Sequence, residues 1–279
     1  MGTPQAHGTD PNIKKVSIEA GETHLGGVHG TTISKSVSFL RPAATTQYTA
    51  KDCLGVDVPV TGGTQATPTV ITGVAHGLAD GDPITITGVG GDTNANCSGY
   101  AKLTGYTADT FALYADKALA TPIVGNAGWS SGGNIARCFR LKGIFRKAGG
   151  DGYVMKVRIG LNSVTALLGD YLRIHFYRRP VTAILDNVAY ALAWANMPYR
   201  LGFVDMPPLI VEAAGGDMIC ALACPNGLPG LSGSNNIGLH VFNDEAVPDT
   251  DLFFLLENLS TGTPANAEPC LVEVDVDNN

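Results

Sequence analysis

The sequence predicts an all-β fold, in which a jelly-roll-like β-sandwich is the host domain and carries an inserted small β-barrel. The first observation is the turn content: 35 glycines and 16 prolines make up roughly 18% of the chain, against roughly 12% in average proteins. The second is the share of charged residues, 15%, where roughly a quarter is usual. The third is the recurrence of short apolar segments between turn clusters, which is typical of sandwiches and jelly rolls.

Alternation of apolar and polar residues identifies the strands of the host domain. In segment 172–177, Leu172, Ile174 and Phe176 share one face and the intervening residues share the other, as in a half-buried strand. Segments 139–147 and 153–160 alternate on either side of Ala-Gly-Gly-Asp-Gly, which predicts a hairpin. Segment 183–195 is either a helix or a loop with one or two turns. Further strands are expected at 37–40, 199–204, 208–213, 218–224, 237–243, 252–258 and 270–276.

A second set of strands lies between two glycine-rich borders, at 61–64 and 130–133. Such borders are expected where a module is inserted into a loop of a host domain. Three parts follow: a flexible N-terminal arm (1–35), a discontinuous β-sandwich (36–62 with 136–279), and the inserted barrel (63–135). Strands of the insert are expected at 70–72, 83–87, 99–105 and 110–114.

The charge is unevenly distributed along the chain. Residues 136–200 contain eleven Lys or Arg and three Asp, whereas residues 201–279 contain twelve acidic residues and no Lys or Arg. The favoured interpretation is that basic and acidic strands pair within one sheet, because opposite charges on neighbouring strands stabilise the ladder. The alternative is that a basic edge of one subunit meets an acidic edge of the next. Nucleic-acid binding is not predicted, since the basic residues alternate with apolar ones as strand residues do.

The six cysteines show no metal-binding spacing. They form no Cys-x-x-Cys pair and no Cys and His pattern of a zinc site. Cys220 and Cys224 would share one face of a strand, where thiols commonly serve as small core residues. The sequence therefore predicts reduced thiols, with no metal site and no cofactor.

Motifs that could indicate an enzyme are each better explained by structure. Residues 230–234 approximate a nucleophile elbow but lie in a Pro, Gly and Ser loop. The pairs Asp249/Asp251 and Asp275/Asp277 have a spacing that suits acid/base work or calcium, which acidic surface strands also show. His24 and His29 fall in the glycine-rich arm, while His76 and His175 fall in a turn and on a strand. We therefore predict that the chain is not an enzyme and has no catalytic, cofactor-binding or metal-binding residues.

Residues 76–133 resemble a small β-barrel repeat found in many bacteriophage structural proteins. The resemblance rests on HGLADGDPITITGV, YAKLTGYTADTFALY and SSGG. The host segments VSFLRPAATTQYTAKDCLGV, LRIHFYRRPVTAILDNVAYAL and TGTPANAEPCLVEVDV resemble, in order and spacing, a family of capsid-associated proteins of tailed bacteriophages. The resemblance implies a virion structural protein.

The function expected from this resemblance is that of a capsid decoration, or cement, protein. Its partners would be the major capsid protein and copies of itself in a homotrimer, and its location the capsid surface of the virion after assembly in the host cytoplasm. No membrane partner is expected, because no apolar run approaches the roughly 18 residues needed to cross a bilayer. The alternative is a tail or fibre-associated protein that recognises a host receptor or glycan. That role would use exposed aromatic residues of the insert: Tyr100, Tyr106, Tyr114 and Trp129.

Overall fold

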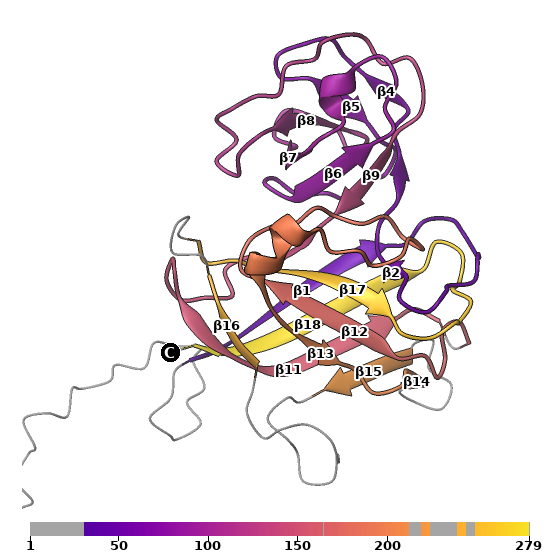
Figure 1. Ribbon diagram of the computed structural model, residues 1–279, viewed down its shortest axis with the longest axis vertical. Helices are drawn as coiled ribbons and strands as arrows, with labels where there is room; N and C mark the ends of the chain where they lie inside the picture. The colour runs from indigo at the N-terminus through magenta and orange to yellow at the C-terminus, as the bar shows by residue number, and fades with distance from the viewer. Residues whose placement is uncertain (1–30, 164, 212–218, 224–238, 244–248, 279) are drawn as a thin grey trace, which may run out of the picture.

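The computed structural model describes residues 31–163, 165–211, 219–223, 239–243 and 249–278. Its fold is all-β, as the sequence predicts, and every strand pairing is antiparallel (Figure 1). The strands form three sheets. Two of them face each other as a sandwich, and the third lies beyond the end of the sandwich toward which β1 points.

The first sheet of the sandwich has six strands, with β1 at one edge and β14 at the other. The chain order along it is β1-β18-β11-β15-β14, and β16 pairs with the first half of β11. A register shift between Val154 and Lys156 separates the parts of β11 that pair with β16 and β15. The strands are β1 (Thr32–Leu40), β11 (Asp151–Leu161), β14 (Ile210–Val211), β15 (Ile219–Ala223), β16 (Leu239–Phe242) and β18 (Pro269–Asn278).

The second sheet has the order β10-β17-β12-β13, with the short β2 also paired to β17. Its strands are β2 (Cys53–Leu54), β10 (Phe139–Leu141), β12 (Leu172–Tyr177), β13 (Arg200–Asp205) and β17 (Leu252–Asn258). The predicted hairpin between 139–147 and 153–160 is wrong, because β10 and β11 belong to different sheets. The chain leaves β10 through Gly143, which has a φ of 67°, and Phe145 donates its N–H to Thr250 instead of pairing with β11.

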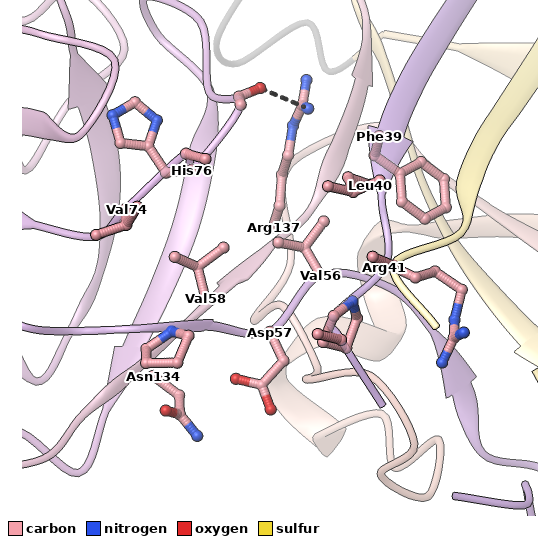
Figure 2. A pocket seen from close by; sticks show the side chains of 16 residues that line it. Phe39, Leu40, Arg41, Val56, Asp57, Val58, Val74, His76, Asn134 and Arg137 are labelled. Carbon is pink, nitrogen blue, oxygen red and sulfur yellow. Dashed lines mark hydrogen bonds between the residues drawn. The ribbon is translucent and has the colours of Figure 1, made fainter. Parts of the chain in front are cut away.

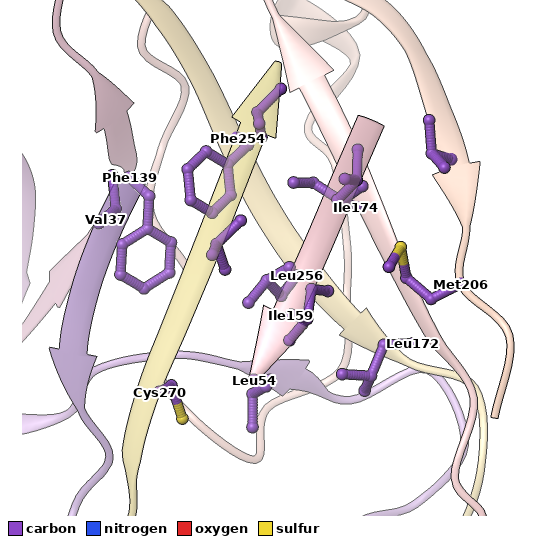
Figure 3. Packing of buried hydrophobic residues seen from close by; sticks show 14 of the residues in the cluster. Val37, Leu54, Phe139, Ile159, Leu172, Ile174, Met206, Phe254, Leu256 and Cys270 are labelled. Carbon is purple, nitrogen blue, oxygen red and sulfur yellow. The ribbon is translucent and has the colours of Figure 1, made fainter. Parts of the chain in front are cut away.

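The core of the sandwich lies between these two sheets (Figure 3). Ile174 and Phe176 from β12 are fully buried in it, as their shared face predicts. The ring of Phe139 stacks on Phe254 at 5.1 Å and packs against Phe39 at 4.3 Å, so β10 and β17 are joined to β1 across the core.

Strands of basic and acidic segments pair within the sandwich. Lys156 on β11 forms ion pairs with Glu273 at 2.7 Å and Asp275 at 3.0 Å, both on β18. Arg173 on β12 pairs with Asp205 on β13 at 2.5 Å. The predicted pairing of basic with acidic strands inside one chain is therefore confirmed at these positions.

The third sheet contains the strands expected in the insert and has its own core. Its order is β3-β9-β6-β7-β8-β5-β4, and Phe111, Leu113 and Ile135 are fully buried within it. Trp129 packs against that core, while Tyr114 is buried outside it. The elements are β3 (Val58–Pro59), β4 (Gly62–Gly63), β5 (Val70–Thr72), β6 (Pro83–Thr87), the 3-10 turn η1 (Thr93–Ala95), β7 (Ser98–Lys102), β8 (Thr110–Tyr114) and β9 (Asn134–Arg137).

A long loop, residues 178–199, covers the outer face of the second sheet. It contains no α-helix; its only helical part is the 3-10 turn η2 (Trp194–Tyr199), so the loop alternative for 183–195 is confirmed. Val181 and Ala183 of this loop pack with Tyr177, Phe253 and Leu255 of the sheet in a separate apolar cluster. The loop therefore buries much of the outer face of the second sheet, while Phe203 on the edge strand β13 stays 44% exposed.

Candidate functional site

A cleft of about 460 Å³ lies where the sandwich meets the third sheet (Figure 2). We call it the junction cleft. The sandwich supplies the end of β1 and the segment that leads into β3, and the third sheet supplies the loop after β5 and part of β9. The lining residues are 39–43, 56–59, 74–77, 134, 137 and 267.

The walls of the junction cleft are mainly apolar. Val56 and Val58 lie between Val74 on one side and Phe39 and Leu40 on the other (Figure 2). Leu40 is 50% exposed and Val74 is 61% exposed, although both are large apolar residues. Exposed apolar residues that face each other across a hollow are typical of a surface that a partner covers.

One charged residue in the cleft is fixed by the third sheet. Arg137 on β9 forms an ion pair with Asp82 at 2.8 Å and donates a hydrogen bond to the carbonyl of Gly77 at 3.4 Å. Burial lowers the pKa of Arg137, and the charge of Asp82 opposes that effect. The guanidinium therefore supports the loop after β5 that carries Val74.

Asp57 lies beside Val56 and Val58 and is half-buried. Burial, and secondly the negative charge of Asp186, raise the pKa of its carboxyl group. Its Oδ1 atom is buried without a hydrogen-bond partner in the structure. The cleft therefore contains one half-buried carboxyl group between apolar side chains.

A buried ion pair holds the sandwich side of the cleft in place. Arg41, which lines the cleft, is 1% exposed and binds both carboxylate oxygens of Asp186, at 2.6 and 3.2 Å. Tyr48 donates its hydroxyl to Asp186 at 2.6 Å, and the N–H of Gly55 donates to the same oxygen at 3.0 Å. Although burial alone would lower it, the hydrogen bond and charge of Asp186 raise the pKa of Arg41. Arg41 also donates to the carbonyl of Ala265 at 3.0 Å, so the cluster joins residues 41–55, 186 and 265, which are far apart in the sequence.

A second charged cluster fixes the third sheet to the sandwich. Arg140 on β10 donates to the carbonyls of Gly81 and Asp80, both at 2.9 Å. Its guanidinium also lies 3.6 Å from Asp82 and 3.7 Å from Asp251. Lys117 of the third sheet's loop binds Asp251 at 2.5 Å and also contacts Asp249. These contacts hold the third sheet against the second sheet, and Asp82 also binds the cleft residue Arg137.

The pair Asp249/Asp251, considered above for acid/base work or calcium, therefore serves in this cluster. Asp251 is 2% exposed and also accepts the N–H of Gly143 at 2.8 Å. Asp275 pairs with Lys156, as described. Within the residues that the structure describes, no group of three or more His, Cys, Asp or Glu side chains is arranged to hold a metal ion.

The histidines of the described chain take structural positions. The Nδ1 atom of His76 accepts the N–H of Leu78 at 3.1 Å, and its ring packs edge-on against Phe111 at 5.3 Å. Burial lowers its pKa. His240 contacts Asp151 on the surface at 3.1 Å. His24, His29 and residues 230–234 lie outside the described residues, as does Cys224.

His175 is the most strongly perturbed histidine. Its Nδ1 lies 3.0 Å from the guanidinium of Arg200, which only donates, so the ring proton is on Nε2 and is donated to Glu257 at 2.7 Å. Burial, and secondly the positive charges of Arg200 and Arg173, lower the pKa of His175 to about 3. The neutral ring stacks on Tyr190 at 4.1 Å. His175 thus fastens the 178–199 loop to the second sheet.

Among the described cysteines, Cys53, Cys97, Cys138 and Cys270 are free thiols. All except Cys97 are buried. Burial raises the pKa of the Cys138 thiol to about 12 and that of Cys97 to about 11. High pKa values keep thiols protonated and unreactive.

A smaller hollow of about 230 Å³ lies on another side of the junction. It is lined by residues 83–84, 98–100, 180–182 and 196. Here the N–H of Ala183 donates to the Thr85 hydroxyl at 2.9 Å, which adds a further contact between the loop and the third sheet. Trp194, two residues from the lining residue Asn196, is 86% exposed.

Comparison of the chain with protein-family models and with curated proteins gives no match. In the described residues, no helix has the length and apolar character required to cross a membrane.

Proposed function

We propose that the chain is a non-enzymatic virion structural protein that binds and stabilises a bacteriophage capsid surface as a decoration, or cement, protein. Its partners are then the major capsid protein and further copies of the chain in a homotrimer. Residues 36–62 and 136–279 form the capsid-binding, jelly-roll-like domain, and residues 63–135 form the projecting module. The resemblance of three host segments and the insert to phage structural proteins supports this proposal.

The observation that carries the proposal is the junction cleft. It is mainly apolar, it presents Leu40 and Val74 half-exposed, and buried ion pairs hold Arg41 on one wall and Arg137 on the other. A preformed hollow of this kind favours association, because little conformational freedom is lost when a partner enters it. Many copies around a capsid would convert modest individual contacts into firm attachment.

The test is occupancy on phage heads that lack this protein. Purified chain is added at a subsaturating concentration, and bound copies per head are counted by quantitative gel analysis. The double variant Leu40→Asp with Val74→Asp is expected to lower occupancy at least tenfold, since it places two charges in the apolar contact. Val124→Asp is the matched control, because Val124 is 51% exposed and lies outside the cleft. Equal occupancy of the double variant and the control would refute the role of the cleft.

A second candidate function, recognition of a host receptor or glycan, is favoured by the exposure of Trp194. Indole rings that stand in solvent beside polar groups are common anchors in binding sites. Trp129, in contrast, contributes to the core of the third sheet and donates its Nε1–H to Gly132 at 2.9 Å. Loss of binding to purified host surface polysaccharide in Trp194→Ala, with unchanged occupancy on heads, would favour this second function.

A further inference from the structure

The free edge of β1 is the longest unpaired strand edge among the described sheets. β1 (Thr32–Leu40) pairs with β18 on one side, and its other side pairs with no strand of the described residues. The other edge strands are shorter: β13 has six residues, β16 has four, and the rest have two or three. Long unpaired edges present N–H and C=O groups that readily pair with another strand.

The register shows which residues face this edge. Asn278 donates its N–H to Thr31, and Arg41 donates its N–H to Glu268, both across the pairing with β18. Because bonding residues alternate along an antiparallel strand, the odd-numbered residues of β1 face β18. The even-numbered residues turn their N–H and C=O groups to the free edge: Thr32, Ser34, Ser36, Ser38 and Leu40.

The side chains of these five residues are all exposed, and none is charged or is a proline, which commonly block edge pairing. Lys35 is the one charged residue of β1, and it is half-buried. Its side chain lies near Gly143, on the inner face of β1, where Phe39 packs on Phe139. The outer face of β1 is thus a row of small hydroxyl groups that ends at Leu40 and the junction cleft.

We propose that this edge pairs with the same edge of a second copy, antiparallel, about a twofold axis at Ser36. Each outward residue then exchanges two backbone hydrogen bonds with its partner: Ser36 with Ser36, Ser34 with Ser38, and Thr32 with Leu40. The two first sheets become one continuous sheet. This twofold contact is a different contact from the threefold one of the proposed homotrimer, and it does not depend on a capsid, so it goes beyond the proposed function.

Self-pairing fits the chemistry of the edge. In the central pairs, Ser36 with Ser36 and Ser34 with Ser38, hydroxyl groups lie opposite hydroxyl groups, which is a favourable cross-strand combination. Lys35 lies opposite Val37 of the other copy, so like charges are not brought together. The arrangement is isologous and closed, which is the commonest form of association between identical chains.

Register-specific crosslinking tests the pairing with the full chain and without capsid. Ser36→Cys places two thiols opposite each other, with Cα atoms about 5.5 Å apart, within the roughly 4.4–6.8 Å range of disulfides. In Ser34→Cys the same two thiols are about 13 Å apart along the strands. Under oxidised glutathione, we expect Ser36→Cys to give a covalent dimer, and Ser34→Cys alone or wild-type chain not to do so. An equimolar mixture of Ser34→Cys and Ser38→Cys should crosslink.

A second pair of variants tests the backbone bonds. Ser36→Pro removes an outward N–H but no bond to β18, and should lower the dimer association constant, measured by analytical ultracentrifugation, at least tenfold. Ser36→Ala keeps that N–H and should change the constant less than twofold. Equal crosslinking of Ser34→Cys and Ser36→Cys, or none of Ser36→Cys, would overturn the proposal. If Ser36→Cys does not crosslink while Ser36→Pro lowers occupancy on heads, the edge takes a capsid strand and the proposed self-pairing is wrong.

Discussion

The buried pair of Arg41 and Asp186 provides the most specific stability prediction. Asp186→Asn leaves the Arg41 guanidinium, 1% exposed, without its counter-charge. Removing one partner of a buried pair costs about 3–5 kcal/mol. For a chain of this size, each kcal/mol lowers Tm by roughly 2–4 °C. Since Asn keeps some of the hydrogen bonds, we take the lower bound of about 3 kcal/mol and expect Tm to fall by roughly 6–12 °C in thermal denaturation followed by circular dichroism.

Asp205→Asn is the matched control for this experiment. It breaks the ion pair with Arg173, but the Asp205 side chain is 52% exposed, and exposed pairs contribute about 0–1 kcal/mol. Its Tm should therefore stay within roughly 4 °C of the wild-type value. If Asp186→Asn and Asp205→Asn lower Tm equally, burial of the Arg41 pair does not hold the cleft wall, and the reasoning is refuted.

Three further outcomes are expected. Phe139→Ala removes a ring that contacts Phe39 and Phe254 in the core and should cost about 3–5 kcal/mol of unfolding free energy; a loss below about 1 kcal/mol would contradict the packing. Arg140→Met leaves the carbonyls of Gly81 and Asp80 without their donor. The amide hydrogen of Cys138, which bonds to the carbonyl of Pro83, should then exchange faster. Unchanged exchange would contradict the role of the charged cluster in holding the third sheet to the sandwich. The pKa of His175 is about 3 in the folded chain and about 6.5 when unfolded. Between these two pH values the unfolded chain binds a proton at His175 and the folded chain does not. The free energy of unfolding should therefore fall as pH drops from about 6.5 toward 3, by at most about 1.4 kcal/mol per pH unit. The raised pKa of Glu257 changes stability in the opposite direction over the same pH range, and Arg173, Arg200 and Asp205 also face the His175 ring. In His175→Gln, the free energy of unfolding should therefore depend less on pH below about 6.5. An unchanged pH dependence would contradict a neutral His175 in the folded chain.

Local features of the fold could be predicted from the sequence. Alternation in 172–177 correctly gave the face of β12 that enters the core, but the half-buried strand it predicted is wrong, because His175 and Tyr177 on the other face are buried as well. The basic character of 136–200 and the acidic character of 201–279 correctly predicted pairs such as Lys156 with Asp275. These signals are readable because strand periodicity and charge are written in neighbouring residues.

Features set by distant contacts could not be predicted. The predicted hairpin failed because glycine and aspartate permit a turn without deciding which sheet each flanking strand joins. Arg41 and Asp186 are 145 residues apart, and no local pattern distinguishes their pairing from a surface charge. The junction cleft likewise depends on how two sheets meet, through Arg140 with Asp82 and Lys117 with Asp251.

The number of copies bound per phage head tests the central proposal most directly. Heads purified without this protein are saturated with the full chain, and bound copies are counted against the major capsid protein by quantitative mass spectrometry. A decoration protein should bind in hundreds of copies per head, spread over the whole capsid surface. A handful of copies would indicate a tail position, and no binding would contradict the proposed function.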